Sequence, residues 1–295
     1  MNNIKKTTIG GQALFEGILM RGPEKVSIVL REESGDLKVK TDKFYSVADR
    51  YKILKIPFLR GIVSLFESLI MGTQAIVYST DEEEEKDEKG VDMGTILTLI
   101  VSLSISVLVF FFVPTLVTSI FKKYLSNVLA LNLIEGLIRI LLFLGYISLI
   151  SNLEDMKRIF MYHGAEHKTI HCYEKGMKLT VENVRTCSRL HRRCGTSFLF
   201  TVMIVSILVL SNFGWPNPLM RLLIRLIMLP VIVGVSYEIN KVLGRSDSII
   251  SKALTAPGLL IQKLGTVKEP TDDMIEVAIK SLEEVIPEDE SLDIW

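Results

Sequence analysis

The sequence lacks a net charge, because 34 Lys and Arg side chains are matched by 34 Asp and Glu. A chain without an excess of basic residues has no global electrostatic reason to bind nucleic acid. Three cysteines, Cys172, Cys187 and Cys194, are too few and too irregularly spaced for a disulfide framework. They favour a reducing compartment. Residues 1–11 hold two lysines with no apolar core after them, so we expect no cleavable signal peptide and insertion through internal helices.

Apolar sequence, in contrast, is abundant. Hydrophobic residues make up 48% of the chain and the mean hydropathy is positive, which predicts a mainly α-helical membrane protein. A helix needs about 20 residues to cross the bilayer core. Long apolar stretches predict four transmembrane helices, at residues 93–121, 124–151, 198–213 and 219–240. The second holds Glu135 and Arg139, one helical turn apart, so that face should pack against protein.

The loops predict the orientation. Segment 152–193 carries nine basic and five acidic residues, whereas the opposite turns contain only Lys122 and Lys123. Because Lys and Arg are retained on the cytoplasmic side, both termini and segment 152–193 are expected in the cytoplasm of a multi-pass plasma-membrane protein.

The polar remainder predicts a cytoplasmic α+β portion. Residues 26–30 and 37–40 favour a small N-terminal β-hairpin, and Thr271 is a predicted cap of a late helix. The stretch 57–78 favours an amphipathic interfacial helix, with a fifth span as the alternative. We therefore divide the chain into an N-terminal segment with the hairpin (1–50), the interfacial helix (51–80), an acidic linker (81–92), spans one and two (93–151), a His/Cys motif loop (152–196), spans three and four (197–240) and a C-terminal segment with a helix (241–295).

All four histidines lie in the motif loop. His163, Glu166 and His167 form an H-x-x-E-H pattern, which on a helix places two imidazoles one turn apart with a carboxylate beside them. Such a pair predicts a divalent metal site, with zinc as the ion and Glu166 as the general base of a hydrolase. The alternative is a solvated juxtamembrane helix, since so short a pattern also arises by chance.

A third ligand has to come from elsewhere in the chain. Glu238 is one possibility, because the fourth span should bring it to the same membrane face. His191 and Cys194 offer a competing imidazole and thiolate pair, or else serve in capping and packing. His171 continues the helical spacing but is expected to be only a neighbour. Glu16 and Arg21 are possible supporting residues around the metal; otherwise their segment packs as a loop on the hairpin.

Long motifs carry a resemblance to a known family. Residues 10–23, 162–169 and 188–198, with shorter stretches near 256–259 and 268–273, resemble the YqhQ-like bacterial membrane proteins, a family of unknown function whose members are labelled predicted metal-dependent enzymes. The resemblance covers nearly the whole chain. It marks His163, Glu166, His167, His191 and Cys194, together with Glu16 and Arg21, as motif positions and leaves His171 outside. Arg192 stands where the family pattern has proline, which affects local loop geometry.

These patterns together predict a membrane-bound metal-dependent hydrolase acting on a peptide or a lipid-linked substrate. One alternative is a non-catalytic metal-binding scaffold or sensor. Another is a small transporter, for which Glu135, Arg139 and Arg225 would line a polar path; structural pairing of these charges is the simpler interpretation.

Overall fold

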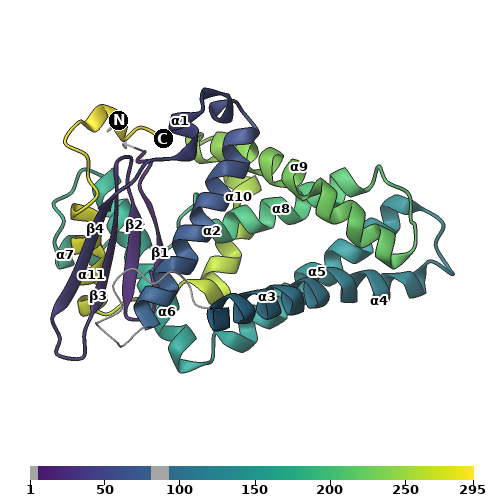
Figure 1. Ribbon diagram of the computed structural model, residues 1–295, viewed down its shortest axis with the longest axis horizontal. Helices are drawn as coiled ribbons and strands as arrows, with labels where there is room; N and C mark the ends of the chain where they lie inside the picture. The colour runs from purple at the N-terminus through teal and green to yellow at the C-terminus, as the bar shows by residue number, and fades with distance from the viewer. Residues whose placement is uncertain (1–5, 81–92) are drawn as a thin grey trace.

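The computed structural model describes residues 6–80 and 93–295, so the predicted acidic linker 81–92 lies outside the described residues. A small sheet with its covering helices occupies one end of the molecule (Figure 1). Long helices extend from it as an arm whose two branches meet at the far end. Trp295 donates its backbone N–H to the carbonyl of Lys6 at 2.9 Å, which ties the last residue to the first described ones.

The sheet is an antiparallel meander in the order β1 (Gly10–Leu14), β2 (Gly17–Arg21), β3 (Lys25–Arg31) and β4 (Leu37–Lys43). The expected hairpin is confirmed as β3 and β4, each slightly longer than predicted. The hairpin of β1 and β2 was not predicted. Its turn places Glu16 at a φ of 49°, without the glycine that usually marks such a turn. In addition, β2 is buried on both faces, so it shows no alternation of apolar and polar residues.

Helices cover both faces of the sheet. Ile18 and Met20 of β2 belong to a core with residues of α6 (Glu154–Glu174) and α11 (Asp272–Glu283), whereas Leu19 packs on the other face with Ala75 of α2 (Leu59–Thr80). The α11 helix begins after Thr271 as predicted, with two aspartates in its first turn. Its apolar side lies on β2 and β3.

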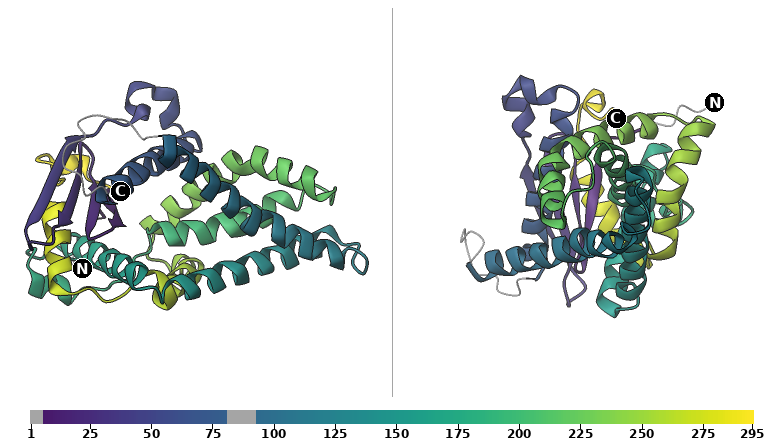
Figure 2. Two further views of the ribbon diagram at one scale, coloured as in Figure 1. Left: turned by 60° about the horizontal axis from the view of Figure 1, so that its bottom comes forward. Right: turned by 90° about the vertical axis from the view of Figure 1, so that its right-hand side faces the viewer.

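The arm consists of two branches (Figure 2). One contains α3 (Met93–Val107), the π-helical turn η2 (Leu108–Phe112), α4 (Val113–Phe121) and α5 (Val128–Ile150); the other contains α8 (Gly195–Leu210) and α9 (Pro218–Arg245). Asn127 and Asn217 cap α5 and α9, and Pro218 occupies the first position of α9.

Four described helices are long and apolar enough to cross a membrane, but they are not the predicted four. They are Leu59–Thr80, Ile96–Phe121, Val128–Ile150 and Pro218–Arg245. The predicted third span corresponds to α8, which has only 16 residues, while α2 has 22. A 16-residue helix is about 24 Å long, short of the bilayer core of about 30 Å.

The α2 helix lies between the sheet and the arm, and its predicted interfacial position stays a prediction. Glu67 bonds Arg21 of β2 at 2.9 Å, and Gly72 lies against the side chain of Gln12 on β1. Toward its start, α2 touches α9, where Gly61 packs on Tyr237. The α2 helix therefore contacts both the sheet, through β1 and β2, and the arm, through α9.

Short elements complete the chain: α1 (Val47–Arg50), η1 (Lys52–Lys55), α7 (Val181–Arg185), α10 (Ile249–Ile261), the π-helical turn η3 (Gln262–Thr266) and η4 (Glu290–Leu292). The α10 helix packs on α8 where Gly258 meets Ser197, and η3 then leads the chain back to α6.

Candidate metal centre

His163 and His167 project from the same face of α6, with ring centroids 4.3 Å apart. The helix is seated against segment 267–270. Lys268 donates its N–H to the Phe160 carbonyl at 2.8 Å, and its own carbonyl oxygen occupies the place where a side chain at Gly164 would lie. The glycine inside the H-x-x-E-H pattern is therefore required for this close approach.

Backbone carbonyls fix the orientation of both imidazoles. Nδ1 of His163 lies 2.9 Å from the Thr266 oxygen, and Nδ1 of His167 lies 2.6 Å from the Arg189 oxygen. A carbonyl only accepts hydrogen bonds, so each Nδ1 carries the proton and each Nε2 is left with a free lone pair. Burial lowers the pKa of His167 to about 4, which keeps this imidazole neutral near pH 7. Histidines that bind metal are held in this way.

Cys194 completes a group of three potential ligands. Its Sγ lies 3.2 Å from Nε2 of His163, and the ligand atoms of His163, His167 and Cys194 all lie within 4.8 Å of one another. Burial raises the pKa of the thiol, but His167 and Thr196 together outweigh burial and hold that pKa below its usual value. Cys194 is also the N-cap residue of α8, where the helix dipole favours a thiolate. Two imidazoles and one thiolate fit zinc and leave its fourth position for water or substrate.

Glu166 lies beside this group and is 5% exposed. Burial raises the pKa of its carboxyl to about 7, against the opposing effects of His163 and of the Gly11 N–H, which bonds Oε1 at 3.0 Å. A carboxyl group with this pKa can take up and release a proton near neutral pH, as a general base must.

The structure separates His191 from Cys194. His191 belongs to a second group with His171 and Glu174, in which the rings of His171 and His191 are 4.7 Å apart. Arg193 bonds the Glu174 carboxylate and lies 3.3 Å from Nε2 of His191. The positive guanidinium of Arg193 inside this group would repel a metal cation. We therefore assign the group to the support of the group formed by His163, His167 and Cys194. His171 is thus part of a polar network rather than a mere sequence neighbour.

Gln262 holds the loop of His191 in place, which the sequence did not indicate. Its fully buried side chain accepts the N–H of His191 at 2.9 Å and donates to the carbonyl of the same residue at 2.8 Å. It also bonds the Ser197 hydroxyl at 3.0 Å. Gln262 opens η3, the turn whose last residue, Thr266, supplies the carbonyl that orients His163. Single π-turns of this kind are frequent at functional sites.

Three other predicted site residues lie elsewhere. Glu238 forms a two-pronged ion pair with Arg60, at 2.7 and 2.5 Å, and is not in the ligand group. Glu16 binds Arg158 through both carboxylate oxygens, each at 2.5 Å. Arg21 pairs with Glu67. Each of these side chains is engaged by an oppositely charged partner, and the family motif around Glu16 reaches the centre through Gly11 instead.

A pocket of about 270 Å³ opens beside Cys194, between α2, α8 and α9. Its wall combines apolar groups such as Leu65 and Phe198 with Arg193 and Lys241, and Trp295 closes one side. This pocket provides the space next to the centre in which a substrate can be held.

Fold and site together define a class: a mainly helical protein with four helices of membrane-spanning length, a small antiparallel sheet and a His/Cys group between them. Residues 56–288 match the family described as "Protein of unknown function (DUF1385)", and the chain belongs to this family. It is similar to "Uncharacterized protein YqhQ" of Bacillus subtilis (strain 168), with 36% identity over 301 residues, covering 94% of this chain and 92% of that protein. No solved structure matches.

Proposed function

We propose that this chain is an integral membrane hydrolase whose cytoplasmic metal centre is held by His163, His167 and Cys194. The observation that carries the proposal is the pair of backbone carbonyls that direct both Nε2 atoms toward the thiol. Because these hydrogen bonds already fix the two imidazoles, less conformational entropy is lost when an ion binds. When bound, zinc supplies Lewis acidity that polarises a substrate oxygen and makes water more acidic.

The chain's own residues then have distinct tasks. Glu166 accepts the proton of the attacking water and returns it to the leaving group, with the Gly11 N–H holding its carboxylate in place. The pocket beside Cys194 holds the substrate. Lys241 on its wall favours a substrate with an anionic group, since Arg193 is already paired with Glu174, and the apolar part of the wall favours a lipid-linked substrate over a plain peptide.

Elemental analysis of purified protein tests the ligand set. We expect about one zinc ion per chain in the wild type, none after His163→Ala/His167→Ala or after Cys194→Ala, and retention after His191→Ala. His191→Ala is the matched control, because this residue is buried like His167 and Cys194 but belongs to the neighbouring group. A wild-type protein prepared without chelator that holds no metal would overturn the proposal.

Hydrolysis tests the role of Glu166. Glu166→Gln should keep its metal and lose about 10²- to 10⁴-fold of the rate on ester, peptide and phosphodiester probes. If Glu166→Gln retains both metal and full activity, Glu166 is not the base. A centre that holds metal in the wild type but hydrolyses none of the probes would point to the scaffold or sensor alternative.

A second function is supported by the lowered pKa of Cys194 and its 3.2 Å contact with His163. A thiolate paired with an imidazole can act as a nucleophile in acyl transfer, with no metal. Cys194→His separates the two functions, because histidine also binds zinc. The variant would keep metal and part of the hydrolysis if the protein is a metalloenzyme, and would lose all activity if the thiol attacks substrate.

A further inference from the structure

A buried cluster of charges lies inside the helical arm, apart from the metal centre. Arg139 of α5 and Arg221 and Arg225 of α9 all bond the single carboxylate of Glu135. The Arg139 contact is 3.0 Å and the Arg221 contact 2.5 Å. None of the four residues is more than 8% exposed.

The charges in this cluster do not balance. Three guanidiniums face one carboxylate, so two positive charges are in excess, and among residues 6–80 and 93–295 no ion pair joins these arginines to another acid. Their remaining partners are neutral. They are the carbonyls of Phe110 and Phe111, both at 3.1 Å, the amide of Asn132 at 3.0 Å, the hydroxyls of Thr115 and Ser206, and the rings of Phe111 and Trp215. Within the described chain, Nε of Arg221 and Nε of Arg225 are buried without any partner.

Structural pairing alone does not account for such a cluster. Charges in an apolar interior are costly unless they are compensated, and one carboxylate compensates only one of the three. The arrangement therefore lacks an anionic partner.

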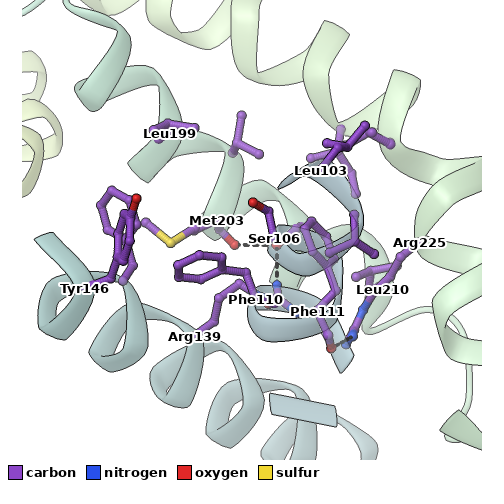
Figure 3. Close-up of a pocket in the computed structure, with 16 residues that line it drawn as sticks. Leu103, Ser106, Phe110, Phe111, Arg139, Tyr146, Leu199, Met203, Leu210 and Arg225 are labelled. Atoms are coloured by element: carbon purple, nitrogen blue, oxygen red, sulfur yellow. Dashed lines mark hydrogen bonds between the residues drawn. The ribbon is translucent and has the colours of Figure 1, made fainter. Parts of the chain in front are cut away.

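A cavity of about 300 Å³ adjoins the cluster, between α3, η2, α5, α8 and α9. Arg139 and Arg225 are among the residues that line it; Figure 3 shows them beside Phe110 and Phe111, with the guanidinium of Arg225 at the Phe111 carbonyl. The rest of the wall is mostly aliphatic and aromatic, including Leu103, Leu199 and Leu229. Such a wall accepts an alkyl chain, whereas the arginines accept an acidic group.

We propose that this cavity binds an anionic amphiphile, with one carboxylate or phosphate headgroup against Arg139 and Arg225 and the alkyl chain among the apolar side chains. Arg221 and Arg225 lie within about 10 Å of the start of α9, at a rise of about 1.5 Å per residue. The headgroup thus sits near the end of the arm that is remote from the sheet. A fatty acid and an anionic phospholipid both carry this chemistry.

Fluorescence titration of the full-length protein in neutral detergent tests the proposal, with cis-parinaric acid as probe and its methyl ester as the uncharged match. The acid should bind at least about tenfold more tightly than the ester, because only the acid compensates the buried guanidiniums. Equal binding of the two would reduce the site to an unselective apolar cavity and overturn the proposal.

Variants locate the binding. Arg225→Gln and Arg139→Gln should each weaken binding of the acid about tenfold or more, while Arg60→Gln, an arginine paired outside the cavity, should leave it unchanged. If removal of a buried arginine prevents folding, Leu229→Trp fills the cavity with every charge retained, and it should abolish binding of the acid. Unchanged binding in that folded variant overturns the proposal.

Native mass spectrometry distinguishes the sources of the headgroup. Phosphatidic acid and a free fatty acid are offered in turn, with phosphatidylcholine as the control. Retention of either acid over phosphatidylcholine supports the site and identifies its headgroup; preference for phosphatidylcholine contradicts it. None of these measurements involves the metal centre, so their failure leaves the hydrolase proposal untouched.

Discussion

Gly11 shows how a single residue joins the sheet to the centre. Its N–H bonds Glu166, and a Cβ built at this position would lie 2.6 Å from the Leu19 carbonyl oxygen and 3.1 Å from the Glu166 carboxyl carbon. The backbone of β1 approaches α6 closely enough that only glycine fits. The first family motif therefore contributes to the site through its backbone.

We predict that Gly11→Ala destabilises the protein by about 1 to 3 kcal/mol, because Leu19 is on a neighbouring strand and cannot move away freely. The same variant displaces Glu166, so hydrolysis should fall as well. Gly10→Ala is the control in the same strand, since its Cβ would meet no atom within 4 Å. Thermal unfolding of the two variants compares them, and equal unfolding temperatures would contradict the close packing described here.

The sequence was informative about the candidate ligands His163 and His167, because residue spacing on a helix fixes the distance between side chains. His163 and His167 are four residues apart, and the structure brings them together as expected. Glu238 could not be placed in this way, because its position depends on how α9 meets α2, where Arg60 binds it. The grouping of Cys194 with His163 but of His191 with Glu174 likewise arises from the loop between helices, for which no periodicity exists.

At the scale of elements, η3 connects the two halves of the site. Gln262 holds the backbone of His191, and Thr266 orients His163 four residues later. Within this single π-turn, the Gln262 side chain meets the His191 loop and Ser197 of α8, while the Thr266 carbonyl meets α6. The role of Gln262 could not be predicted from the sequence, because it is a single polar residue in a mostly apolar stretch and resembles no binding motif.

Gln262→Leu should destabilise the protein by about 2 to 3 kcal/mol, since it leaves the N–H and carbonyl of His191 buried without partners. Bound metal should decrease only modestly, because the ligands themselves remain. Ser211→Ala, which removes a hydroxyl bonded only within its own helix end, is the control. Denaturant unfolding followed by elemental analysis measures both effects; complete loss of metal in a folded Gln262→Leu protein would make this glutamine a direct participant.

The pattern of helices and strands was predictable where the environment is simple. Arm helices give long, mostly apolar stretches of sequence. The hairpin of β3 and the edge strand β4 was predictable from two short β-prone runs joined by a turn. Predictions failed for β1 and β2, which are enclosed by other elements, and for α8, which is as apolar as a span but shorter. Burial by protein and burial by lipid select the same residues, so composition alone does not distinguish them.

At the scale of the whole molecule, the arm and the sheet unit make different demands on their surroundings. Large apolar side chains such as Leu97, Ile105 and Leu141 are exposed along the arm, whereas the sheet unit carries the charged surface. We propose that the arm lies in the bilayer and that the sheet unit faces the cytoplasm, with the loop around Ser126 on the opposite side.

Cysteine labelling tests this placement. Ser126→Cys should react with a membrane-impermeant maleimide in intact cells, and Ser34→Cys only after the membrane is opened. Both positions are exposed, and the three native cysteines are buried, so the parent chain serves as background. Labelling of Ser34→Cys in intact cells would reverse the proposed orientation, and labelling of both would place the arm outside the bilayer.

The order of the elements along the chain has a consequence for synthesis. The four strands lie in the first 43 residues, but α11, which covers one face of the sheet, begins at Asp272. Every arm helix must therefore leave the ribosome before that face is covered. Gly11, Cys194 and Thr266 come together over the same interval, so an unfinished chain cannot assemble the His/Cys group until translation is nearly complete.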